Sequence, residues 1–219
     1  MSNRFKSRYD DDINLFEGRW HLAQYAILMA LLMAAPWILG SYYLGELTAV
    51  LVWSLAGLGL MLISGHTGQV SLGHAAFMAI GAFTNLALMM RGWHFIPALL
   101  ASAVTSGVLG AIISRPILRM SGIYLAIATL ALSIIIEDVS IIAEPITGGV
   151  AGLFAPPIDM FGLKIDRYTS PAAFYYLCLT VLVIVTLGYL NLLRSASGRS
   201  FLAVRDSEVS ARALGVNVA

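Results

Sequence analysis

The residues of this sequence with the clearest capacity for chemistry are four histidines and one cysteine. His21, His66, His74 and His94 are scattered, and the sequence contains neither an HExxH zinc motif nor a GxSxG nucleophile motif. It also lacks a GxxxxGK[ST] phosphate-binding loop, so we do not expect the chain itself to hydrolyse nucleotide. Cys178 is the only cysteine, which excludes a disulfide framework or a cysteine metal site. We therefore expect no catalytic residues and no metal or cofactor in this chain.

Glu137 and Asp138 are adjacent acids inside a long apolar run. A carboxylate inside a membrane is energetically expensive and by default indicates a functional position. If a helix begins near Ile123, Glu137 lies about 21 Å along its axis at 1.5 Å per residue, in the outer third of a span. This depth favours a role in an outer vestibule or interface. The alternative is a coupling-ion site, which would indicate a secondary transporter or channel.

The segment 64–74, with the sequence SGHTGQVSLGH, is polar, uncharged and rich in glycine between two apolar runs. Glycine permits a tight turn or an unwound backbone, and the N-terminus of a following helix offers free N–H groups. Two interpretations stay open: a tight inside loop packed against its neighbours, or a broken or re-entrant segment that lines a transport path. The candidate path residues are Gly65, Gly68, Ser71, Gly73 and His74.

The connection 144–170 contains three prolines and a glycine-rich run, so it should resist regular helix. It is long enough to form a structured external cap that could meet a soluble partner, or it is a plain surface loop. The candidate residues of this outer loop are Thr147, Gly148, Gly149 and Gly152.

After the last apolar run, residues 201–214 are expected to form one short cytosolic helix. Gly198 and Gly215 bound it and suit its start and its C-terminal cap. Its charges are mixed rather than purely basic, so a helix that fits a groove in a soluble partner is favoured over one that lies on anionic headgroups.

The elements that position these residues follow from composition. Hydrophobic residues make up 59% of the chain and charged residues only 11%, which differs strongly from soluble domains. A bilayer core needs about 20 apolar residues per helix, and the long uncharged stretches match that length. We therefore expect an all-α polytopic bundle with spans at about Leu22–Leu39, Leu44–Ile63, Leu72–Met90, Phe95–Ile113, Ile123–Ala143 and Pro171–Leu193.

The distribution of positive charge predicts the orientation. With the N-terminus inside, ten of the 13 Lys and Arg residues lie on the cytoplasmic side, in keeping with the positive-inside rule. Net charge +1 gives no basic field for nucleic acid. The expected organisation is a cytoplasmic tail (1–20), a membrane domain (21–193) that includes the external loop 144–170, and a cytoplasmic segment (194–219) in which the domain is incomplete.

Four blocks resemble one family of transporters. Residues 64–83 resemble the SGxxGxxSLGHAAFxxIGAY signature of branched-chain amino acid ABC importer permeases. Residues 121–131, SGIYLAIATLA, are similar to a stretch of the LivM-type subunit, and residues 147–153 resemble its TGGxxGL loop. Residues 198–217 resemble its cytoplasmic GRxxxAIRExExxAxxLGxN loop.

The resemblance implies a permease of a bacterial-type inner membrane that pairs with a LivH-type second permease subunit. It also implies two cytosolic ATPase subunits, which would bind ATP and Mg²⁺, and a periplasmic binding protein that delivers the substrate. Family members continue through further membrane helices, so the 219 residues are expected to be a truncated N-terminal portion.

By the same resemblance, the cytoplasmic tail would be the coupling helix. Permeases generally carry an EAAxxxG pattern there; aligned on Gly215, this sequence has Val209 in place of the Glu, with Glu208 one position earlier. The coupling residues implied are Gly198, Arg199, Arg205, Glu208, Ala211, Leu214 and Gly215.

The resemblance leaves the substrate open. Branched-chain or related hydrophobic amino acids are favoured, and urea or short amides are the alternative because importers of those compounds share this permease family. An ion-coupled secondary transporter or channel is the further alternative, and it would depend on Glu137 and Asp138.

Overall fold

The computed structural model of this protein describes residues 19–117, 120, 122–160 and 163–215. Over these residues the chain is almost entirely helical, as expected for an all-α polytopic bundle, and this prediction is confirmed. The long helices are α2 (Arg19–Ile38), α3 (Ser41–Leu60), α4 (His74–Met90), α5 (Phe95–Ile117), α6 (Ile123–Ile142) and α8 (Pro171–Arg194).

Within the described residues, four helical stretches are long and apolar enough to cross a membrane, judged by length and composition. Two other apolar helices are shorter, Leu22–Ile38 and His74–Met90. Together they account for the six spans expected from the sequence. The four longer stretches are Ser41–His66, Phe95–Arg115, Ile123–Ile142 and Pro171–Arg194.

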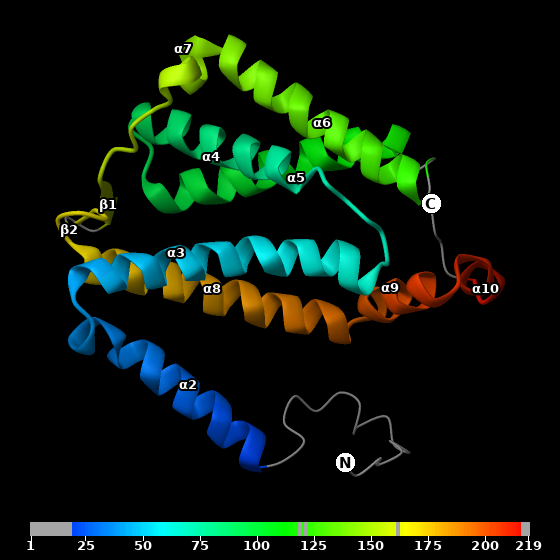
Figure 1. Cartoon of the computed structure of the whole chain (residues 1–219), viewed down its shortest axis with the longest axis horizontal. Helices are drawn as coiled ribbons and strands as arrows, with labels where there is room; N and C mark the ends of the chain where they lie inside the picture. Colours follow the sequence, from blue (N-terminus) through cyan, green and yellow to red (C-terminus); the bar gives the residue numbers. More distant parts are fainter. Residues whose placement is uncertain (1–18, 118–119, 121, 161–162, 216–219) are drawn as a thin grey trace.

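Helices α3 and α8 lie side by side, and the C-terminal end of α2 packs against them at one apolar core (Figure 1). Proline has no N–H, so Pro36 leaves the carbonyl of Leu32, four residues earlier in α2, without its helical donor. The hydroxyl of the fully buried Tyr175 donates to that carbonyl at 2.8 Å, and Tyr176 donates to the carbonyl of Met33 at 2.8 Å. These bonds tie α2 to α8. The core is formed by Ala35, Leu44, Leu51, Tyr175 and Leu179.

Helices α4, α5 and α6 form the second group, in which α4 contacts both neighbours. Small residues let α5 approach α4 closely, as expected for packing inside a membrane. The hydroxyl of Ser106 donates to the carbonyl of Phe77 at 3.0 Å. One turn further along α5, a Cβ on Gly110 would lie 3.4 Å from the ring of Phe77.

The connection 144–170 is a structured cap at one end of the bundle (Figure 1). It begins with the short helix α7 (Glu144–Thr147) and the 3-10 turn η2 (Gly149–Ala151). An antiparallel hairpin follows, in which β1 (Ile158–Met160) pairs with β2 (Leu163–Ile165). Strand β1 contacts α5 and β2 contacts α8, so the hairpin bridges the two helix groups.

The opposite end carries the π-helix η1 (Met61–His66), which continues α3, and the short helices α9 (Ala196–Asp206) and α10 (Glu208–Ala213) (Figure 1). The expected single helix over 201–214 is wrong. Ser207 is extended, and its side chain accepts a hydrogen bond from the N–H of Ser210 at 3.3 Å. A serine that caps a new helix in this way competes with continuation of the old one.

The expected helix start at Gly198 is also wrong. Helix α9 begins at Ala196, and Ser195 is its N-cap, accepting from the N–H of Gly198 at 3.4 Å. Gly198 therefore lies inside the first turn. Gly215 follows the end of α10 with φ of +83°, the left-handed conformation that suits a C-terminal glycine.

Candidate functional site

Helix α9 brings together two groups of candidate residues that are far apart in the sequence. It contacts η1, and Nη1 of Arg205 donates to the carbonyl oxygen of Gly65 at 2.8 Å. A Cβ on Gly68 would lie 3.2 Å from Cγ of Arg205, and Gly68 has φ of +70°. A candidate coupling residue therefore contacts two candidate path residues directly.

The other candidate coupling residues are spread around α9 and α10. Gly198 is buried where α9 leaves α8, and Nη1 of Arg199 donates to the carbonyl of Arg194 at 3.0 Å. Ala211 is buried, whereas Leu214 is 81% exposed. Glu208 and Gly215 lie at the start of α10 and just beyond its end.

The π-helix before Gly68 is also attached to α8. The Nδ1 atom of His66 lies 3.2 Å from the carbonyl oxygen of Met61 and 3.2 Å from the hydroxyl of Tyr189. The two rings meet edge to face with centroids 5.8 Å apart. Sequence reasoning missed Tyr189 because it lies in a uniformly apolar span; its only signal is a polar tip near the C-terminal end of that span.

Residues 67–73, which we call the interrupted segment, join η1 to α4 without forming a helix. The N–H of Leu72 donates to the hydroxyl oxygen of Thr129 at 3.0 Å. A Cβ on Gly73 would lie 2.8 Å from the carbonyl oxygen of Thr129. The hydroxyl of Ser71 accepts a weaker bond from the N–H of Gly73 at 3.4 Å.

The interrupted segment runs back into the bundle before α4 begins. Thr129 is six residues into α6, which is about 9 Å along its axis. A Cβ on Gly59 would lie 2.8 Å from the His74 ring, and Gly59 is seven residues before the end of η1. The backbone therefore turns at the helix end and re-enters, which is the geometry of a broken segment. That it lines a transport path stays a prediction.

The outer loop is organised by Thr147, which is buried. Its hydroxyl oxygen lies 2.5 Å from the carbonyl oxygen of Ser140 and 2.9 Å from that of Ala143, which share its single proton, and it accepts from the N–H of Gly149 at 3.2 Å. Gly148 has φ of +76°, and a Cβ there would lie 2.2 Å from the carbonyl oxygen of Gly152.

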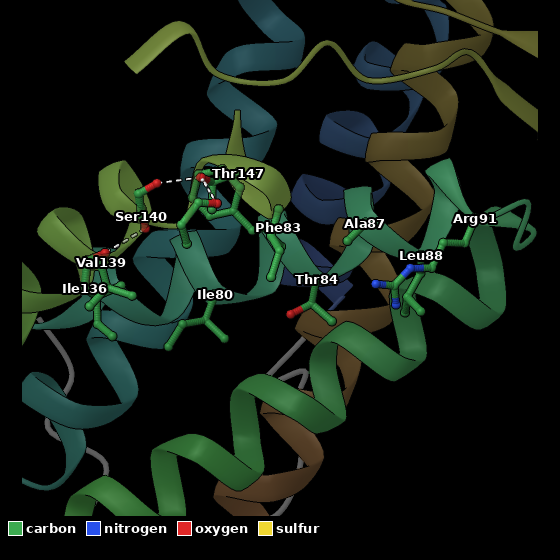
Figure 2. Close-up of a pocket in the computed structure, with 12 residues that line it drawn as sticks. Ile80, Phe83, Thr84, Ala87, Leu88, Arg91, Ile136, Val139, Ser140 and Thr147 are labelled. Atoms are coloured by element: carbon green, nitrogen blue, oxygen red, sulfur yellow. Dashed lines mark hydrogen bonds between the residues drawn. The ribbon is translucent and has the colours of Figure 1, made fainter. Parts of the chain in front are cut away.

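Two cavities flank the contact between α4 and α6 just below this loop. One, of about 360 Å³, is lined by Thr84 of α4, by Arg91 just after that helix, and by Ser140 and Thr147, as Figure 2 shows. The other, of about 440 Å³, is lined by the small alanines of α4 and by Glu137 on α6. Both have largely apolar walls, as small-molecule sites do.

Metal binding finds no support in the described part of the chain, where no three His, Cys, Asp or Glu residues lie close enough to hold an ion. Glu137 lines a cavity, whereas Asp138 lines neither of the two. The histidines are separated in the same way: His66 bonds Tyr189 and Met61, and His74 packs on Gly59.

Comparison with known proteins gives one consistent result. The family model described as branched-chain amino acid transport system / permease component matches residues 42–219. The high-affinity branched-chain amino acid transport system permease protein LivM of Salmonella typhimurium strain LT2 is 32% identical, over 89% of this chain and 52% of its own length. LivM of Escherichia coli strain K12 is 30% identical, over 87% and 50%. The chain thus spans about half the length of these curated relatives. No solved structure matches it.

Proposed function

Since the chain belongs to the family of branched-chain amino acid transport permease components, we propose that it is a permease subunit of an ATP-driven importer. The proposed substrates are branched-chain or related hydrophobic amino acids, which the LivM relatives are named for. The family resemblance, the apolar helices and the sequence without a phosphate-binding loop favour a transport role over catalysis.

The observation that carries this proposal is the contact between α9 and the turn before the interrupted segment. A cytosolic ATPase drives transport only if it moves part of the membrane domain. Helix α9 lies beyond the last apolar span and donates from Arg205 to Gly65 at 2.8 Å. Work done on α9 from the cytosol would thus reach the broken part of the bundle directly.

The proposed assembly has four further components. They are a LivH-like second permease subunit, two cytosolic ATPase subunits and a periplasmic binding protein. ATP and Mg²⁺ belong to the ATPase subunits, and this chain contributes no catalytic residue. The proposed location is the inner membrane, with residues 1–20 and 194–219 in the cytoplasm. On the outer face, the cap 144–170 would meet the binding protein.

The proposal is tested with the full-length protein, purified with its partners and reconstituted in proteoliposomes. Uptake of radiolabelled leucine should require the binding protein and hydrolysable ATP, and a non-hydrolysable ATP analogue should abolish it. If unlabelled urea competes for uptake and unlabelled leucine does not, the substrate belongs to the urea and short-amide class. Uptake that needs only an ion gradient would overturn the ATP-driven mechanism. Glu137, which lines one of the cavities, would then be the candidate site for the coupling ion.

A further inference from the structure

Helix α9 is anchored at both ends. At its start, a Cβ on the buried Gly198 would lie 2.2 Å from the carbonyl oxygen of Leu193, so α9 leaves α8 by a tight corner. At its far end, Arg205 donates to Gly65 at 2.8 Å. Arg205 is seven positions after Gly198 in α9, which is about 10 Å along the helix axis at 1.5 Å per residue. The N-terminal end of α9 is thus fixed to α8, and its C-terminal end contacts η1, the turn that follows α3.

The C-terminal end of α9 fits closely against this turn. The carbonyl that Arg205 binds belongs to Gly65, in the π-helix η1, and π-helical turns are frequent at functional sites. The aliphatic part of Arg205 covers Gly68, where a Cβ would lie 3.2 Å from Cγ of the arginine. Because Gly68 also has φ of +70°, any larger residue there would be strained and would press against Arg205.

The far end of the interrupted segment is fixed to a different helix. Leu72 donates to Thr129 of α6 at 3.0 Å, and Gly73 has no room for a side chain against the same threonine. If the C-terminal end of α9 moves relative to α6, the backbone conformation between Gly68 and Leu72 must therefore change. The backbone is not helical over this stretch, and the N–H of Gln69, which donates to the carbonyl of Ile63 at 3.2 Å, ties its first residues to η1.

We infer that Arg205 is the positioning residue that transmits movement of α9 to the interrupted segment, through the carbonyl of Gly65 and the backbone of Gly68. The inference rests on the proposed function and refines it. The family resemblance implied that Arg205 is one of the residues that couple the chain to the ATPase. The geometry directs its guanidinium to the chain's own backbone, so its replacement should uncouple the transporter without releasing the ATPase.

The first test uses the assembled full-length transporter with Arg205→Met, which keeps most of the side-chain length and removes the donor. The number of ATP molecules hydrolysed per leucine imported should rise about fivefold or more, within the usual range of coupling between sites. Arg205→Lys should restore part of the coupling because an ammonium retains one donor to Gly65. The control is Arg115→Met, an exposed arginine near the end of α5, which should leave the ratio unchanged.

Copurification and a second variant keep the test decisive. The ATPase should copurify with Arg205→Met in the wild-type ratio; its loss would show that Arg205 binds the ATPase and would overturn the inference. Gly68→Ala should also uncouple, because it disturbs the same contact from the other side. Normal coupling in both variants would equally overturn it.

Hydrogen exchange of the assembled transporter separates this inference from the proposed function. Addition of an ATP analogue should change exchange in peptides 196–206 and 61–74 of the wild type. In Arg205→Met the change in 196–206 should remain and the change in 61–74 should be lost. A retained change in 61–74 would overturn the inference alone. A wild type whose 196–206 peptide does not respond to nucleotide would refute the proposed function, and the inference with it.

Discussion

At the scale of single residues, most serine and threonine hydroxyls within the spans donate to a carbonyl of their own helix three or four residues earlier, whereas two side chains satisfy backbone groups that irregular geometry leaves open. Water is absent from a bilayer core, so an unpaired N–H or carbonyl there costs several kcal/mol. Tyr175 takes the carbonyl that Pro36 frees, and Thr129 takes the N–H of Leu72 in the interrupted segment. Irregular backbone inside this bundle therefore depends on a few identifiable side chains.

Thr129→Val tests this dependence. The change keeps the shape of the buried side chain but leaves the Leu72 N–H without its acceptor, at a cost of about 1–3 kcal/mol. We expect the thermal unfolding midpoint of the full-length protein to fall, whereas Thr129→Ser, which keeps the hydroxyl, should lose much less. Equal midpoints for the valine and serine variants would mean that the Leu72 N–H finds another partner.

Two outer-loop glycines make a matched pair. Gly148 and Gly152 both have positive φ, +76° and +71°, but only Gly148 lacks room, since a Cβ would lie 2.2 Å from the carbonyl of Gly152. Gly148→Ala should therefore reduce leucine uptake severalfold. Gly152→Ala meets no clash but must adopt φ of +71° with ψ of −178°, a conformation essentially restricted to glycine that costs about 1–3 kcal/mol, and it should reduce uptake less. If both variants retain wild-type uptake, the loop has no part in transport.

The sequence predicted the glycines with unusual backbone better than it predicted the side chains that make distant contacts. Gly68 was singled out because glycine permits an unwound backbone, Gly148 because its run should resist helix and Gly215 because glycine suits a helix C-terminus, and all three have positive φ. Gly65 and Gly73 were singled out with Gly68, but they do not have positive φ. Thr129 and Tyr189 could not be found in the same way. Their partners lie 57 and 123 residues away in the sequence, and a threonine or tyrosine in an apolar helix has no local pattern that indicates a distant contact.

At the scale of elements, spans were predictable because lipid imposes one length and one polarity on them. The expected starts at Phe95, Ile123 and Pro171 coincide with the helices observed. The segment that follows α8 was not predictable in this way. Whether a chain continues as helix through Ser207 depends on a balance of about 0.5–2 kcal/mol between capping and continuation, and apolar periodicity does not report that balance.

The corner between α8 and α9 gives a prediction at this scale. Gly198→Ala would place a methyl group 2.2 Å from the carbonyl oxygen of Leu193, so α9 must swing away from its position. We expect ATP-driven leucine uptake to fall at least severalfold while the protein still inserts in the membrane. The control is Gly188→Ala in α8, where a Cβ meets nothing within 4 Å; this change should not reduce uptake.

At the scale of the whole molecule, the surface is as apolar as a membrane domain requires. Trp53, Ile123 and Ile142 are 69%, 71% and 80% exposed in this chain. Exposed apolar side chains of this size mark surfaces that lie against lipid or against other protein. Orientation is the remaining global property, and the bias of Lys and Arg predicts it independently of any contact.

Cysteine labelling tests the orientation. In a Cys178→Ala background, Tyr168→Cys and Met120→Cys place thiols at opposite ends of the bundle, at positions 86% and 47% exposed. A membrane-impermeant maleimide added to cells stripped of their outer membrane should label position 168 at once, and position 120 only after lysis. The reverse result would place α9 outside the cell. Arg205 would then face away from any cytosolic ATPase, and neither the proposed import mechanism nor the transmission through Gly65 could hold.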